Sequence, residues 1–200
     1  MNRRTIFVAA VAAALVVSAA CGPSASSGVA GKAASFDQQF IDMMVPHHQG
    51  AVEMAKIAQR RGEHPEVKRM AEGVVASQST EIDRMKAWRK QWFGSEQTPP
   101  MGQMPMVEGM QGGGGHAGMG GAATMDMAAD VEKLRNAGEP FDRAFIDAMI
   151  PHHESAIEAA RAAQTRAQRP EIKQLAQEIV AAQEREIAQM KEWRRAWFGA

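Results

Sequence analysis

Residues 36–48 read FDQQFIDMMVPHH, and residues 141–153 read FDRAFIDAMIPHH. The two stretches are offset by 105 residues, and the same offset relates Pro65 to Pro170 without a gap. Repeats of this kind are supersecondary units that bury their apolar faces against a neighbouring copy. The sequence therefore predicts one structural unit used twice.

Each unit is expected to form two helices joined by a short turn. In the first unit, apolar residues recur at steps of three and four along residues 35–61 and again along residues 65–93, which is the spacing of one helix face. Pro65 suits the first position of a helix, where its missing N–H costs nothing. We expect an all-α protein, because two tandem helical hairpins can bury both apolar faces by packing as a four-helix bundle.

The chain divides into five segments of distinct composition. Between the repeats lies a stretch rich in Gly, Met and Pro that offers little material for a core, so we expect a long flexible crossover. The predicted segments are a signal peptide at 1–20, a lipoprotein tether at 21–34, hairpin repeats at 35–94 and 130–200, and a Gly/Met-rich linker at 95–129.

The N-terminus predicts export. Two arginines precede an apolar run that ends in small residues, as in a signal peptide. At about 16 residues the run is shorter than the roughly 20 that cross a bilayer as a helix. Cys21 follows it and resembles the lipidated cysteine of bacterial lipoproteins, although Ser18 departs from that pattern. We expect a lipoprotein anchored on the extracytoplasmic side of the cell membrane, with plain secretion as the alternative.

Composition limits the classes of partner. Lys plus Arg and Asp plus Glu both number 23, so the formal net charge is zero and no general basic surface recommends nucleic acid. Hydrophobic residues make up 45% of the chain, which is typical of a globular protein. The single cysteine cannot form an internal disulfide.

Polar residues interrupt the apolar stripes of both predicted helices, and buried polar groups need partners. In an antiparallel hairpin that turns at residues 63 and 64, His47 lies level with about residue 80, which makes Glu81 its neighbour. His48 is about 100° around the helix from His47 and is expected either at the rim of the site or in a position that supports its ligands. The converging residues are Met44, His47, Gln78, Glu81 and Met85, with Met149, His152, Gln183, Glu186 and Met190 as their copies.

This residue set suits a metal. Imidazole binds copper, zinc, iron and nickel, whereas the soft thioether of methionine selects Cu(I) among them. Met44 is three residues before His47 and four before His48, so all three side chains leave adjacent turns of one helix face. The predicted ligands are Met44, His47, His48, Glu81, Met85, Met149, His152, His153, Glu186 and Met190, with Gln78 and Gln183 as hydrogen-bonding support. Histidines paired with buried glutamates, and methionines filling a core, are the structural alternatives.

The linker adds further soft ligands. Methionine tracts of this kind resemble those of extracytoplasmic copper-handling proteins, where thioethers replace oxidisable cysteines. A low-complexity spacer is the alternative. The residues concerned are Met101, Met104, Met106, Met110, His116, Met119, Met125 and Met127.

The repeated motif Phe-Asp-x-x-Phe-Ile-Asp-x-Met-Val/Ile-Pro-His-His, followed by AVEMA at residues 51–55 and by Gln78, Glu81, Met85 and Trp88, resembles the bacterial family of domain of unknown function 305. That resemblance implies an exported domain with a ferritin-like helical fold, and some members are tied to copper binding or copper tolerance. By position, it implies binding roles for Met44, His47, His48, Met149, His152 and His153.

Three functions fit the sequence. We expect a non-catalytic protein that binds Cu(I) or Cu(II), buffers it, or passes it to a protein partner. A ferritin-like di-metal oxidase is less consistent with the chain, because such sites use Glu-x-x-His pairs and neither histidine doublet has a Glu three residues before it. A structural or partner-binding module without metal is the third. The sequence does not decide whether the two clusters form one shared site.

Overall fold

The structure is a computed structural model that describes residues 34–103 and 127–199. Helices are the only regular secondary structure within these residues, so the predicted all-α fold is confirmed. Three predicted features lie outside the described residues. They are the signal peptide, the tether from Cys21 to residue 33, and residues 104–126 of the linker. Among the helices that are described, none combines the length and apolar character needed to cross a bilayer.

Two tandem hairpins make up the fold, as predicted. The first pairs α1 (Phe36–Arg61) with α2 (Pro65–Phe93), and the second pairs α4 (Phe141–Arg166) with α5 (Pro170–Phe198). The Ser35 hydroxyl caps α1 by accepting a hydrogen bond from the Gln38 N–H. Pro65 and Pro170 occupy the first helical turns of α2 and α5, so the sequence signal for these boundaries is confirmed.

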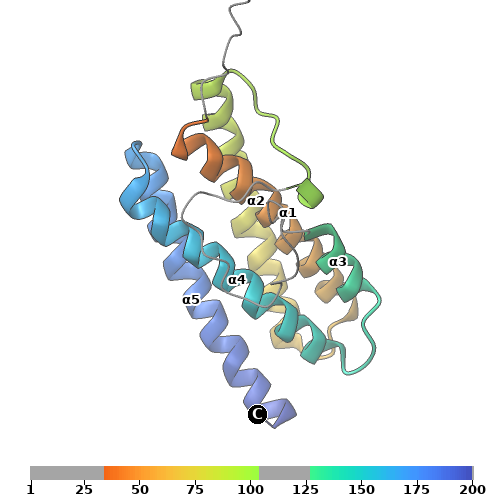
Figure 1. Cartoon of the computed structure of the whole chain (residues 1–200). Helices are drawn as coiled ribbons and strands as arrows, with labels where there is room; N and C mark the ends of the chain where they lie inside the picture. Colours follow the sequence, from red (N-terminus) through yellow and green to blue (C-terminus); the bar gives the residue numbers. More distant parts are fainter. Residues whose placement is uncertain (1–33, 104–126, 200) are drawn as a thin grey trace, which may run out of the picture. The chain divides into compact units, whose positions relative to one another are not determined.

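The hairpins meet along α1 and α4, which lie side by side and antiparallel (Figure 1). The start of α1 packs with the end of α4 in one apolar cluster, and the start of α4 packs with the end of α1 in a second. Phe40 and Ala163 represent the first cluster, and Phe145 and Ala58 the second. Each cluster therefore contains residues from both hairpins, so neither hairpin has a complete core by itself.

A buried aspartate from each hairpin anchors the turn of the other. The Asp142 carboxylate accepts hydrogen bonds from the backbone N–H groups of Glu63 and His64, at 3.0 and 2.8 Å, and from the His64 Nδ1–H at 2.6 Å. Asp37 accepts from the backbone N–H groups of Gln168 and Arg169 at 2.9 and 3.1 Å. Because His64 and Arg169 give their own helices no side-chain cap, the N-termini of α2 and α5 are capped from the opposite hairpin.

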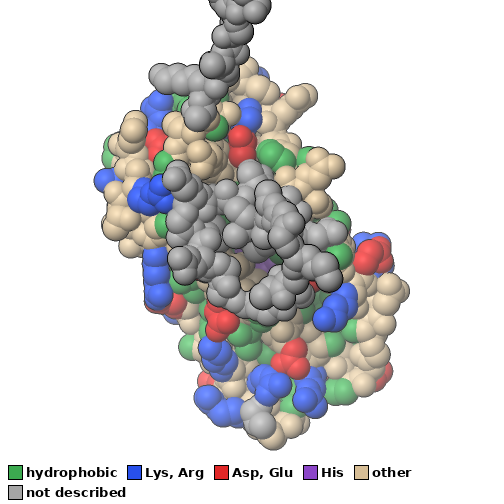
Figure 2. All heavy atoms as spheres, in the orientation of Figure 1, with side chains coloured by type: hydrophobic (Ala, Val, Ile, Leu, Met, Phe, Trp, Pro, Cys, Tyr) green, Lys and Arg blue, Asp and Glu red, His purple; other side chains and the backbone are tan. Residues whose placement is uncertain are grey.

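Aromatic contacts follow the same exchange between hairpins. The His64 ring stacks on Trp197 with centroids 3.8 Å apart, and at the equivalent place the Arg169 guanidinium lies 4.1 Å from the centre of the Trp92 ring. These paired contacts relate the hairpins by an approximate two-fold axis between α1 and α4. On the face that Figure 2 shows, acidic and basic side chains are interspersed, as the zero net charge suggests.

The connection between the hairpins contains structure that the sequence analysis missed. A 3-10 helix, η1, spans Met101–Gln103, and a helix, α3, spans Met127–Arg135. The last three residues of the predicted linker therefore begin a helix, and the boundary at residue 129 divides it. Its apolar residues Met127, Val131 and Leu134 are buried, and Val131 and Leu134 join the second apolar cluster. Their spacing of four and three is helical, but nine residues beside a Gly-rich tract give a weak signal.

Replacement of Asp142 tests the exchange of caps. Asp142→Ala leaves two backbone N–H groups and His64 without their acceptor, so we expect the free energy of unfolding to fall by roughly 2–4 kcal/mol. Urea denaturation followed by circular dichroism measures this loss. Asp83→Ala, which removes an exposed carboxylate from α2, is the control and should change stability by less than about 0.5 kcal/mol. Equal effects of the two substitutions would contradict the role of Asp142.

Candidate metal centre

Four histidines meet where α1 and α4 pack together. His47 and His152 face each other across the approximate two-fold axis, with ring centroids 3.9 Å apart and ring planes at 48°. His48 and His153 flank them, with centroids 6.3 and 6.2 Å from their sequence neighbours. All four side chains are buried. We call these four residues the histidine cluster, and it is one shared assembly of both repeats.

The two glutamates bind the outer histidines. Glu81 Oε2 lies 2.7 Å from His48 Nε2, and Glu186 Oε2 lies 2.7 Å from His153 Nε2. A carboxylate accepts a hydrogen bond from an imidazole N–H, so in the neutral form of each ring Nε2 carries the proton and Nδ1 carries the lone pair. The Nδ1 atoms of His48 and His153 are buried and have no hydrogen-bond partner within the described chain. Each glutamate therefore fixes the orientation and tautomer of one imidazole.

The expected pairing of His47 with Glu81 is wrong. Glu81 bonds His48, because His48 lies on the side of α1 that faces α2, whereas His47 faces α4. His48 has no exposed surface. Its role, as a ligand at the rim of the site or as a support for other ligands, stays a prediction. Within a single hairpin, the inward face of α1 can pack only against α2. In the structure that face is shared with the second hairpin.

Ser155 fixes the tautomer of His47. The Ser155 hydroxyl donates its proton to the carbonyl of His152 at 2.8 Å, so its oxygen accepts from His47 Nε2–H, also at 2.8 Å. The lone pair of His47 therefore lies on Nδ1, which is buried and unpaired among the described residues. His152 differs, because neither of its ring nitrogens has a described partner. Ser155 was not among the predicted site residues. The alignment of the two repeats distinguishes it, because the equivalent residue of the first repeat is Gly50.

The inner histidines are neutral at physiological pH. Burial lowers the pKa of His47 well below 6.5, and the neighbouring rings of His48 and His153 lower this pKa further. Burial, followed by the ring of His47, lowers the pKa of His152 in the same way. The neutral imidazole is the form that binds metals.

The predicted methionines are buried in the apolar clusters on either side of the histidines. Met44 and Met85 belong to the first cluster, and Met149 and Met190 belong to the second. Their role as metal ligands stays a prediction. The predicted supporting amides, Gln78 and Gln183, are buried, and the Oε1 atom of each lacks a hydrogen-bond partner within the described residues. Their role as support for the site stays a prediction.

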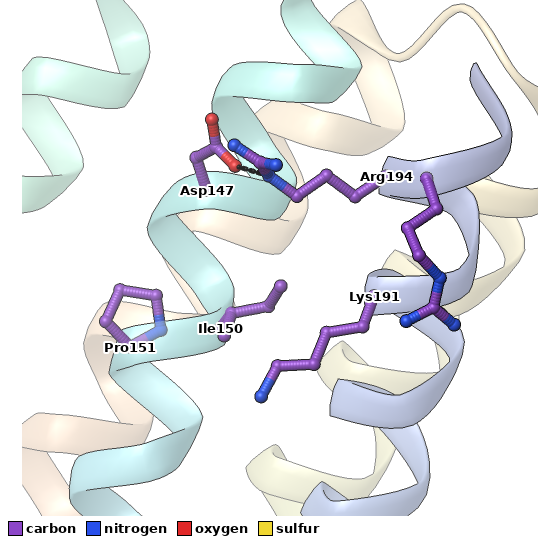
Figure 3. Close-up of a pocket in the computed structure, with 6 residues that line it drawn as sticks. Asp147, Ile150, Pro151, Lys191 and Arg194 are labelled. Carbon is purple, nitrogen blue, oxygen red and sulfur yellow. Dashed lines mark hydrogen bonds and ion pairs between the residues drawn. The ribbon is translucent and has the colours of Figure 1, made fainter. Parts of the chain in front are cut away.

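Two further observations concern where a ligand could bind. In residues 34–103 and 127–199, no three His, Cys, Asp or Glu side chains are grouped so as to hold a metal ion between them. A surface hollow lies on the outer side of α4 and α5 (Figure 3). Asp147 forms an ion pair with Arg194 there, and the exposed Pro151 and Lys191 also line it. The buried histidines do not line this hollow, so we place the candidate site at the histidine cluster, where unpaired nitrogens concentrate.

Fold and site together define a class of duplicated helical hairpins with a buried histidine cluster at their interface. The chain belongs to the family of domain of unknown function 305, whose sequence pattern matches residues 37–194. The family resemblance drawn from the repeated motif is thereby confirmed.

Solved structures with the same fold include CopM in its Cu(I)-bound form, which is 36% identical with a TM-score of 0.65 and covers 82% of this chain and 98% of that one. CopM in its Cu(II)-bound form is 40% identical, with a TM-score of 0.62 and coverage of 81% and 97%. A family member from Streptomyces coelicolor is 29% identical, with a TM-score of 0.60 and coverage of 78% and 90%.

A curated relative, the protein L153 of Acanthamoeba polyphaga mimivirus, is 41% identical over 51 residues. The match spans 26% of this chain and only 34% of the length of that relative.

The lowered pKa values of His47 and His152 predict how stability depends on pH in the metal-free protein. The unfolded chain takes up these protons as the pH falls through about 6.5, whereas the folded protein takes them up at lower pH. Stability is therefore fully present above 6.5 and is lost as the pH falls toward the folded pKa values. Each histidine contributes a slope of up to about 1.4 kcal/mol per pH unit.

Urea denaturation between pH 8 and pH 5 measures this slope. The double variant His47→Gln, His152→Gln is the control and should show a smaller decrease below pH 6.5. A stability that is constant over this range, or an equal decrease in the control, would contradict the argument.

Proposed function

We propose that this protein binds copper through the histidine cluster and its flanking methionines, and buffers the metal or delivers it to a partner without catalysing a reaction. The observation that carries the proposal is a set of five buried imidazole nitrogens, on His47, His48, His152 and His153, that have no hydrogen-bond partner among residues 34–103 and 127–199. A buried polar atom without a partner costs about 1–3 kcal/mol. A metal ion would use these lone pairs and offset that cost.

The donor set fits copper in particular. Imidazoles whose lone pair lies on Nδ1, as in His47, and buried thioethers are ligands of Cu(I), and imidazoles also bind Cu(II). Met44 and Met149 lie one helical turn before the histidines on α1 and α4. The cited CopM structures hold Cu(I) or Cu(II), and a further one holds silver, a soft ion with similar preferences. At 36% identity this likeness supports metal binding by this chain and, less strongly, copper as the metal.

The role is non-catalytic in this proposal. Each hairpin contributes one glutamate to the cluster, and a hydrogen bond with histidine already engages it. Both carboxylates are therefore better placed to orient imidazoles than to bridge metals, although Glu81 and Glu186 stay candidate ligands.

Lipidation of Cys21 would keep the protein at the extracytoplasmic face of the membrane, where it could meet incoming copper and a partner that exchanges it.

A second candidate, a structural module without metal, has one specific observation in its favour. The hydrogen bonds from Glu81 to His48 and from Glu186 to His153 link the two helices of each hairpin and would do so without any ion. If this were the whole role, added metal would leave the melting temperature unchanged, because only binding to the folded state raises it.

Copper binding by the cluster can be tested by replacing its histidines, with a histidine outside the cluster as the matched control. Replacing His47, His48, His152 and His153 by Gln removes every imidazole of the cluster, so we expect Cu(I) affinity to fall by roughly 100-fold or more. Competition with a chromophoric Cu(I) chelator measures the affinity, and circular dichroism checks that the variant stays helical. The control replaces His64 alone by Gln; this residue lies at the start of α2 against Asp142 and Trp197 and not in the cluster, so the variant should retain the original affinity. Equal Cu(I) binding by both variants would contradict the proposal.

A further inference from the structure

The approximate two-fold symmetry fails at one position beside the histidine cluster. Ser155 on α4 accepts a hydrogen bond from His47 Nε2. The equivalent residue on α1 is Gly50, which has no side chain, and His152 Nε2 has no hydrogen-bond partner in the described part of the chain. The two central imidazoles are therefore chemically different, although they come from the same repeated motif.

The space at Gly50 is occupied by a residue from the crossover. A methyl group at Gly50 would lie 3.1 Å from the Cβ of Met127, 3.5 Å from its Cγ and 3.5 Å from His152 Nε2. The Met127 side chain and the unpaired nitrogen therefore border the same point, and Met127 Cγ and His152 Nε2 lie within about 7 Å of each other. Met127 is itself buried, with 5% of its surface exposed.

We propose that Met127 and His152 form an additional soft-metal site that exists once per chain. This inference rests on the proposed copper-binding function and adds a thioether from α3 to the residues of α1 and α4. The ligand would be a soft monovalent cation, Cu(I) or Ag(I), held between the thioether of Met127 and Nε2 of His152. The methionine side chain has several rotatable bonds, so its sulfur can adjust toward the nitrogen.

The lone pair of His152 can be placed on Nε2 at little cost. Neither ring nitrogen of His152 bonds a side chain of the described residues, so no side chain there fixes the opposite tautomer; the ring also lies against the backbone of His47. The Nε2 atom of His47, by contrast, is committed to Ser155. The asymmetry thus makes His152 the central histidine whose Nε2 is not committed to a serine and which lies on the side of Met127 of α3.

Silver titration of the full-length chain tests this site. In protein labelled with carbon-13 in the methionine methyl groups, the Met127 methyl signal is identified by its loss in Met127→Leu. We expect this signal to shift when Ag(I) is added, and Met127→Leu to bind one equivalent of Ag(I) roughly tenfold or more weakly. Met70→Leu, which removes a half-buried methionine near the start of α2, is the control and should bind as the original protein does.

A second variant acts on the nitrogen. Gly50→Ser would offer His152 Nε2 the hydroxyl that Ser155 offers His47, and its Cβ would press on Met127, so we expect it to weaken the same equivalent of Ag(I). If other methionine signals shift with Ag(I) while Met127 does not, or both variants bind as tightly as the original chain, this inference is overturned and the proposed function stands. If no methionine signal shifts and the chain takes up neither Ag(I) nor Cu(I), the proposed function fails as well.

Discussion

The packing of α1 against α4 at the His47–His152 contact is the constraint on which the rest of the structure depends. Two imidazole rings with centroids 3.9 Å apart can share a buried interface only while they are not both charged, because two buried positive charges would repel strongly. Burial maintains that neutrality by lowering both pKa values. The contact that joins the hairpins is therefore also the place where uncharged nitrogen ligands concentrate.

The exchanged contacts at the ends of the helices hold this interface in register. Asp37 and Asp142 cap helices of the opposite hairpin, and both apolar clusters mix residues of α1 and α4. A change in the angle between α1 and α4 would break these caps together with the histidine contact. Interactions at both ends of the helix pair thus hold the cluster in place before any ion binds. Keeping unpaired nitrogens buried reduces the stability of the fold, and a bound ion would relieve that loss.

Much of this arrangement could be predicted from the sequence, because it rests on periodicity and repetition. The repeat predicted both hairpins, and the spacing of apolar residues and the position of Pro65 predicted the ends of α1 and α2. The partners of the histidines could not be predicted, because His47 faces a helix from the other repeat and arithmetic within one hairpin assigns it to Glu81 instead. Helix α3 could not be predicted for a related reason. Its apolar residues are stabilised by packing into the second apolar cluster, which includes residues distant in the sequence.

X-ray absorption spectroscopy of the Cu(I)-loaded protein tests the central claim most directly, because sulfur and nitrogen neighbours of copper scatter differently. Copper held by the histidine cluster and its methionines should show both kinds of neighbour, and the nitrogen contribution should disappear when the four clustered histidines are replaced by Gln. A first shell made only of nitrogen or oxygen, or one that those replacements leave unchanged, would contradict the account.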